Sequence, residues 1–153
     1  MIASGARVLP DELADRLFSV VTRFCLALPR GRRRSGDLKE IEFLALTILS
    51  GHGTMIVGDI QRLLGVLPAQ MSRIIRSLEG RDRPLIGCRI NARDKRKIDV
   101  CLTAAGEKAL LEYQGARIGR LVELLRDLSE EDQDDLVRLV EKLSGLLERG
   151  QGS

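Results

Sequence analysis

The chain has 153 residues and a net charge of +3, and 44% of its residues are hydrophobic, 31% charged and 3% aromatic. This apolar content is enough for a packed core and argues against wholesale disorder, while the length fits one domain with extended helices. The sequence contains no run of about 18 apolar residues and no apolar leader behind a basic start. We therefore expect a cytoplasmic protein without a membrane segment.

The charge is distributed unevenly along the chain. Residues 73–97 carry nine basic and three acidic residues, whereas residues 127–148 carry eight acidic and two basic ones. A concentrated basic segment is typical of proteins that bind nucleic acid. We therefore expect the segment from 73 to 97 to face phosphates.

The first helix is predicted to start at Pro10, because proline suits a first turn and the acids that follow favour the positive end of the helix dipole. Its apolar residues recur at helical spacing as far as Leu28. The basic, glycine-containing segment 30–36 indicates either a contact with the DNA backbone or a solvated loop.

A second helix is expected from the capping box of Asp37 and Glu40 to a left-handed residue at Gly51. Its predicted inward face consists of Ile41, Leu44, Ala45 and Ile48. A short apolar stretch, residues 54–57, follows.

Two short helices then meet through a tight turn, which predicts a helix-turn-helix. The first carries Ile60, Leu63 and Leu64 and ends at Gly65, and the second starts at Pro68. The inward face of the second helix follows helical spacing at Met71, Ile74, Ile75 and Leu78. Its outward face and flanks carry small, polar and basic side chains without an acid, and these are our predicted DNA-binding residues: Ala69, Gln70, Ser72, Arg73, Arg76 and Ser77.

From residue 86 the pattern changes from helical to alternating, which predicts a hairpin of strands 86–90 and 98–102. Its basic tip adds four predicted DNA-binding residues, Arg93, Asp94, Lys95 and Arg96. The three cysteines are odd in number and widely spaced, so we expect reduced thiols rather than a disulfide framework or a zinc site. Within the hairpin, Cys88 and Cys101 differ in strand parity, which argues against a disulfide between them.

Thr103 is predicted to cap a long helix, and Ser129 with Asp132 forms a capping box for a last helix. The Leu/Val stripes of the first and last helices exceed what a small winged domain can cover. Either a second copy covers them or they pack within one chain; we expect the second copy. The expected organisation is therefore a winged helix-turn-helix at 37–102 and dimerisation helices at 1–36 and 103–153, in a mainly α-helical fold with a small β-hairpin wing.

The residues Asp94-x-Arg96-x-x-x-Val100-x-Leu102-Thr103-x-x-Gly106 resemble the D-x-R…L-T-x-x-G signature of MarR-type regulators, and the order of elements is similar across nearly the whole chain. The resemblance implies a homodimer that binds a near-palindromic double-stranded DNA operator, with its wings at the flanking minor grooves. It also implies that the dimer acts as a repressor and that a small-molecule effector or an oxidant relieves the repression. It also implies that Arg96 enters the minor groove and that Asp94 orients basic side chains; the alternative is a hairpin-stabilising ion pair between the two.

The family often starts the second helix of its helix-turn-helix with Ser or Asp caps, whereas this chain has Leu67-Pro68-Ala69-Gln70, which leaves the first-turn contacts open. Arg73 matches the family's common basic position, and bidentate Arg to guanine is the most frequent specific contact in the major groove. Arg76 fits either a base or a phosphate.

The sequence leaves three alternative functions to consider. Cys25 lies on a helix where some relatives sense peroxides, yet a buried structural thiol fits its apolar neighbours better. A winged-helix module that binds protein instead of DNA is a second alternative. An enzyme is not expected, nor a metal or other cofactor, because no nucleophile with a base, paired carboxylates, ligand cluster or phosphate loop occurs, and His52 is interpreted as a turn residue.

Overall fold

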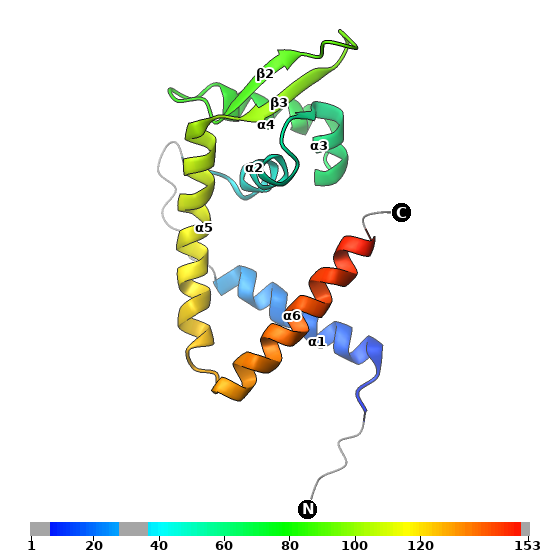
Figure 1. Cartoon of the computed structure of the whole chain (residues 1–153), viewed down its shortest axis with the longest axis vertical. Helices are drawn as coiled ribbons and strands as arrows, with labels where there is room; N and C mark the ends of the chain where they lie inside the picture. Colours follow the sequence, from blue (N-terminus) through cyan, green and yellow to red (C-terminus); the bar gives the residue numbers. More distant parts are fainter. Residues whose placement is uncertain (1–6, 28–36, 151–153) are drawn as a thin grey trace, which may run out of the picture. The chain divides into compact units, whose positions relative to one another are not determined.

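The computed structural model describes residues 7–27 and 37–150 and divides the chain into two units. The N-terminal unit contains α1 (Pro10–Ala27). The second unit contains all other elements (Figure 1): α2 (Glu40–His52), β1 (Met55–Ile56), α3 (Val57–Leu64), α4 (Pro68–Glu79), β2 (Ile86–Ile90), β3 (Ile98–Leu102), α5 (Ala104–Leu125) and α6 (Glu130–Gly150). The expected fold class, mainly α-helical with a small hairpin, is confirmed.

The hairpin belongs to a three-stranded antiparallel sheet in the order β1-β3-β2. Strands β2 and β3 have the predicted limits, with Ile86 opposite Leu102 and Cys88 opposite Val100. Strand β1 was not predicted. It is only two residues long and pairs Met55 with Val100, and two residues are too few to show an alternating pattern.

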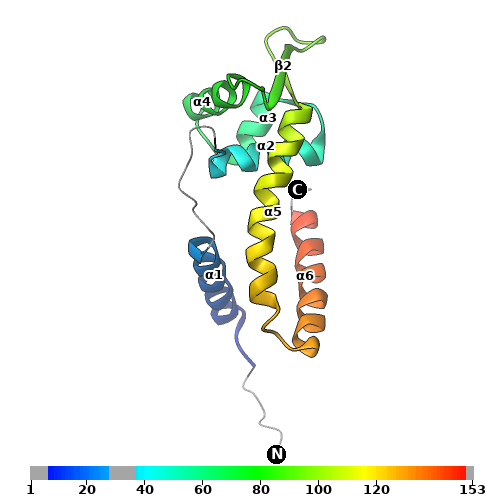
Figure 2. The same cartoon turned by 90° about the vertical axis from the view of Figure 1, so that its left-hand side faces the viewer.

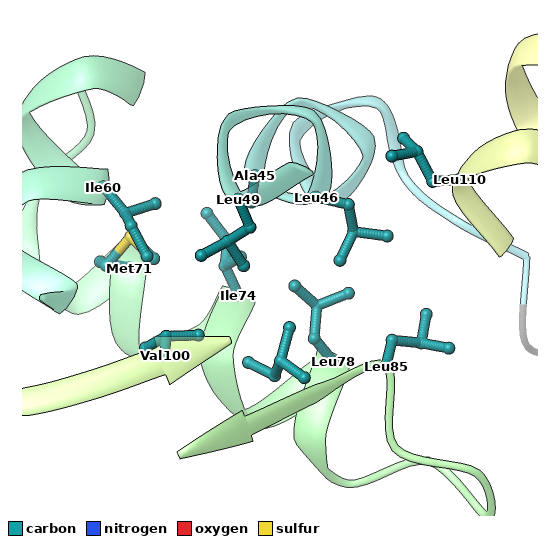
Figure 3. Close-up of a cluster of buried hydrophobic side chains, with 11 residues drawn as sticks. Ala45, Leu46, Leu49, Ile60, Met71, Ile74, Leu78, Leu85, Val100 and Leu110 are labelled. Atoms are coloured by element: carbon teal, nitrogen blue, oxygen red, sulfur yellow. The ribbon is translucent and has the colours of Figure 1, made fainter. Parts of the chain in front are cut away.

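A single apolar core joins α2, α3, α4, the sheet and the start of α5. Its buried side chains converge between α2 and the sheet (Figure 3): Ala45, Leu46, Leu49, Ile60, Met71, Ile74, Leu78, Leu85, Ile86, Val100 and Leu110. The inward face predicted for α4 is present, with Ile75 half-buried at its border. In α3, by contrast, Ile60 is buried and Leu63 is exposed.

Helix α2 differs from the prediction at both ends and in its inward face. It starts at Glu40 rather than within an Asp37 cap, and the carboxylate of Glu42 accepts the backbone N–H of Lys39 at 2.9 Å. It continues through Gly51 to His52, and the residue with positive φ is Gly53, at 75°. The buried face is Glu42, Ala45, Leu46 and Leu49, while Leu44 is exposed.

Helix α5 starts directly after β3, capped by Thr103 as predicted. The Thr103 hydroxyl accepts the backbone N–H of Gly106 at 3.0 Å and donates to the carbonyl of Pro84. A Cβ at Gly106 would lie 2.0 Å from the carbonyl oxygen of Leu85. The glycine of the signature is therefore required for α5 to approach the strand-entry loop this closely.

Candidate nucleic-acid interface

Helix α4 presents an exposed face whose central residues are Ala69, Gln70, Arg73 and Arg76; we call it the reading face. The buried residues on the opposite side hold the helix against the core, so the reading face points away from it. Within the described part of the chain, Arg73 and Arg76 form no ion pair, and both guanidinium groups are available to a ligand. Pro68 is the first residue of α4 and no side chain caps the helix. The backbone N–H groups of Ala69 and Gln70 are therefore open as well.

The two predicted serines lie on opposite flanks of the reading face. Ser72 and Arg76 border an open hollow of about 350 Å³ between α4 and the sheet, lined also by Val57, Ile75, Glu79, Cys88 and Ile98. Ser77 lies on the flank toward α2, where its hydroxyl donates to the buried carboxylate of Glu42. Its oxygen is thus engaged inside the protein.

The hairpin projects beyond α4 (Figure 2), and its tip is exposed at Arg93, Lys95 and Arg96. Asn91, which the sequence reasoning did not single out, organises this tip. Its side-chain oxygen accepts the backbone N–H groups of Arg93 and Asp94, both at 2.9 Å, and its amide donates to Asp99 at 2.8 Å. An asparagine at the end of a strand, followed by a polar turn, is a recognised signal for such a side-chain turn.

Asp94 and Arg96 are directly paired at the tip. The Nε and Nη2 atoms of Arg96 donate to the two carboxylate oxygens of Asp94 at 3.1 and 3.2 Å, and the backbone N–H of Arg96 donates to Oδ1 at 3.1 Å. The hydrogen bonds from the side chain of Arg96, and then from its backbone, hold the pKa of Asp94 below its ordinary value. The Arg96 side chain nevertheless remains 90% exposed. The pair therefore orients Arg96 outward without burying its charge.

The cysteines are free thiols. Cys101 lies opposite Gly87 and donates to its carbonyl at 3.7 Å, while Cys88 lies opposite Val100, so the argument against a disulfide holds. Burial, with a hydrogen bond to Glu79, raises the pKa of Cys88 to about 12. The expected burial of Cys25 is wrong for the single chain: the thiol is exposed on α1, because no residue of that helix is buried.

His52 is the last residue of α2, and its Nδ1 lies 2.9 Å from the carbonyl oxygen of Ile48. Within residues 7–27 and 37–150, no group of three or more His, Cys, Asp or Glu side chains is placed to hold a metal ion. No helix in the same residues is long and apolar enough to cross a membrane. The basic segment 30–36, for which a DNA-backbone contact was one prediction, lies outside the described residues.

Comparisons with known proteins agree with this geometry. The model of the MarR family matches residues 38–98, and no curated protein matches the chain. Among solved structures, a transcriptional regulator from Thermotoga maritima is similar with a TM-score of 0.71 and 18% identity over 94% of this chain and 99% of that one. Wild-type apo MarR from E. coli is similar with a TM-score of 0.71 and 18% identity, over 90% and 98%. BpsR of Bordetella bronchiseptica, whose DNA binding is regulated by 6-hydroxynicotinic acid, has a TM-score of 0.61 and 20% identity, over 87% and 98%.

The family match and the fold coincide on the same elements. The matched residues run from the start of α2 to the start of β3 and include the helix-turn-helix and the hairpin tip. Regulators of this family are generally not enzymes. Residues 38–98 thus match the model of the MarR family over a winged helix-turn-helix, and the fold of the chain is similar to that of solved MarR regulators.

Proposed function

We propose that the chain binds a near-palindromic DNA operator as a homodimer through α4 and the hairpin, and that a small-molecule effector relieves this binding. The observation that carries the proposal is the reading face of α4, where Arg73 and Arg76 are exposed and unpaired beside a basic hairpin. Guanidinium groups without an intramolecular partner are suited to phosphates and guanine edges.

Helix α4 has the features of a helix that enters the major groove. Its first-turn N–H groups are uncapped and fit a phosphate, while Gln70 and Arg73 are one turn apart on the exposed face. Arg73 is assigned to a guanine edge and Arg76, at the border of the hollow, to a phosphate or base. Ser72 lies beside Arg76 on that flank and is assigned to a backbone contact.

The hairpin tip is assigned to the minor groove. Arg96 is oriented outward by Asp94 and is flanked by the exposed Arg93 and Lys95. A single arginine inserted into a narrow groove gains from its concentrated negative potential. The ion pair and the DNA contact are compatible in this arrangement, since the carboxylate holds the guanidinium in place before DNA arrives.

The homodimer is supported by the apolar surface that the single chain leaves uncovered. Neither α1 nor α6 has a buried residue. Large apolar side chains are exposed on both helices: Leu13, Leu17, Phe18, Val20, Val21 and Leu26 on α1, and Val137, Leu139, Val140, Leu143, Leu146 and Leu147 on α6. Surfaces of this kind in soluble proteins usually lie at interfaces. A second copy is the simplest partner, because each copy supplies the same helices.

The proposed effector is argued from a protein of the same fold. BpsR shows that a protein of this fold couples DNA binding to a small aromatic acid. We extend to this chain the principle that a small ligand controls DNA binding.

Sequence preference tests the assignment of α4. A DNA site is first selected for binding to the wild type from a pool of random duplexes. Fluorescence anisotropy then measures the affinity of the wild type, of Arg73→Ala and of the control Arg138→Ala for this selected site and for a random duplex; Arg138 is exposed on α6. Arg73→Ala is expected to lose about 1–3 kcal/mol on the selected site and to relax preference at one base pair per half-site. The control should bind as the wild type does. Equal weakening on all sequences would reassign Arg73 to a phosphate, and no binding by the wild type would favour a protein-interaction module.

Sedimentation velocity tests the dimer. The wild type is expected to sediment as a dimer at micromolar concentration, and a Leu139→Glu, Leu143→Glu variant as a monomer that no longer binds the selected site. A monomeric wild type would refute this part of the proposal.

A further inference from the structure

We infer that Glu42 is a positioning residue for α4, which fixes the angle of the reading face through Ser77 and the entry to the hairpin through Arg81. The inference rests on the proposed DNA binding for its functional consequence. Its structural basis is a carboxylate that is 2% exposed and faces three separate segments of the domain.

Each segment contributes one contact to Glu42. The backbone N–H of Lys39, before α2, donates to Oε1 at 2.9 Å. The hydroxyl of Ser77, in the last turns of α4, donates to Oε2. The guanidinium of Arg81, in the loop between α4 and β2, lies 3.6 Å from Oε1, and its side chain is itself only 21% exposed. The two carboxylate oxygens thus connect α2 to the last turns of α4 and to the loop that leads from α4 to β2.

Burying a carboxylate at this position has a high cost in desolvation free energy. Removing an ionised group from water costs more than an apolar side chain of similar size would, and the cost is offset only while its partners are in place. An apolar residue would pack with several orientations of α4, whereas the directional hydrogen bond from Ser77 and the ion pair with Arg81 together select one. The network therefore specifies orientation more than it adds stability.

The hydrogen bond to Glu42 also changes the role that we infer for Ser77. Its position on the flank of the reading face suggests a DNA contact, but its hydroxyl is engaged with Glu42 on the side toward α2. Arg73 lies four residues earlier, one turn away along α4. A change in the Ser77–Glu42 contact would therefore tilt the guanidinium that reads DNA without removing any atom from the interface.

The experiment compares Glu42→Gln, Ser77→Ala and the double variant with a matched control, Glu40→Gln, which makes the same substitution at an exposed residue of α2. We measure the ratio of affinity for the selected site to affinity for a random duplex. Misplacement of one guanine contact per half-site should lower this ratio about tenfold in Glu42→Gln. A loss of folded protein alone would lower both affinities equally and leave the ratio unchanged.

Additivity separates the two roles of Ser77. If Ser77 acts through Glu42, the double variant should show nearly the same affinity ratio as Glu42→Gln alone. If the two residues act independently, the fold-changes of the two single variants should multiply in the double variant. Multiplicative effects, or an unchanged ratio in Glu42→Gln beside a wild type that binds DNA, would overturn the inference.

Hydrogen exchange provides a readout that does not require DNA. Glu42→Gln should speed exchange of the amides in the last turn of α4 and in residues 80–85, and Glu40→Gln should not. Equal exchange rates in the two variants would overturn the inference, whether or not the wild type binds DNA. Failure of the wild type to bind DNA would instead contradict only the proposed function.

Discussion

Substituting Gly106 by alanine tests the close approach that joins the hairpin to α5. The new Cβ would lie 2.0 Å from the carbonyl oxygen of Leu85, 3.0 Å from its carbonyl carbon and 3.1 Å from Cδ2 of Leu102. The nearest atom belongs to the backbone, so no flexible side chain can relieve the clash, and α5 must shift by roughly 1.4 Å to reach ordinary contact. The same carbonyl accepts the backbone N–H of Thr103 at 3.2 Å, so the shift also strains that hydrogen bond.

Three contributions set the magnitude. Overpacking costs about 1–3 kcal/mol, the weakened hydrogen bond about 1 kcal/mol, and alanine returns about 1 kcal/mol through its higher helix propensity. We expect Gly106→Ala to lower the free energy of unfolding by about 2 kcal/mol. The control, Gly115→Ala, lies in the same helix with nothing within 4 Å of the added Cβ. It should raise stability by up to about 1 kcal/mol.

Urea denaturation followed by circular dichroism, at one fixed protomer concentration, measures the difference between the two variants. We expect a difference of about 3 kcal/mol. Equal stability of Gly106→Ala and Gly115→Ala would refute the argument that the signature glycine is required by the approach of α5 to Leu85.

Three further predictions follow from single contacts. Thr103→Ala should lower stability by about 1–2 kcal/mol, since it removes the cap on Gly106 and the donor to Pro84, and Thr103→Ser, which keeps both groups, should restore most of it in the same urea assay. In a carboxyl NMR titration Asp94 should titrate at lower pH than ordinary aspartate, and its ion pair with Arg96 should be lost as the pH falls through this lowered pKa. A titration midpoint of Asp94 that does not change in Arg96→Ala would contradict the role of Arg96 in lowering it. Cys88, whose pKa burial raises to about 12, should react with iodoacetamide at pH 8 about a thousandfold more slowly than free cysteine, and labelling at the free-cysteine rate would show an ionised thiol.

The elements that could be predicted from sequence are those with an unambiguous period. The hairpin strands alternate strictly, and α4 has four apolar residues at helical spacing with polar residues between them, so both were placed within their observed limits. The motif residues Thr103 and Gly106 were also identified, and the structure adds the physical reason for each.

Helix α2 shows why other features were missed. Its sequence is apolar at most positions, so two different stripes fit helical spacing. The predicted stripe runs through Leu44, whereas the buried residues include Leu46 and Leu49. The true stripe contains Glu42, which residue-type tendencies place at the surface. Besides the local N–H of Lys39, its carboxylate needs the long-range partners Ser77 and Arg81 to be buried at tolerable cost, and a local pattern does not reveal such partners.

The salt dependence of binding to a random duplex tests whether α4 and the hairpin contact DNA, because it counts phosphate contacts without needing an operator sequence. Anisotropy titrations from 50 to 200 mM salt compare the wild type with Arg96→Ala at the hairpin tip and Arg138→Ala on α6. We expect the wild type to bind with an affinity that falls steeply with salt. Arg96→Ala should reduce the slope of log K against log salt by roughly two, because a dimer has two tips, and Arg138→Ala should leave the slope unchanged. A wild type that does not bind at 50 mM salt, or a slope that Arg96→Ala and Arg138→Ala change equally, would contradict the proposal that the chain binds DNA through α4 and the hairpin tip.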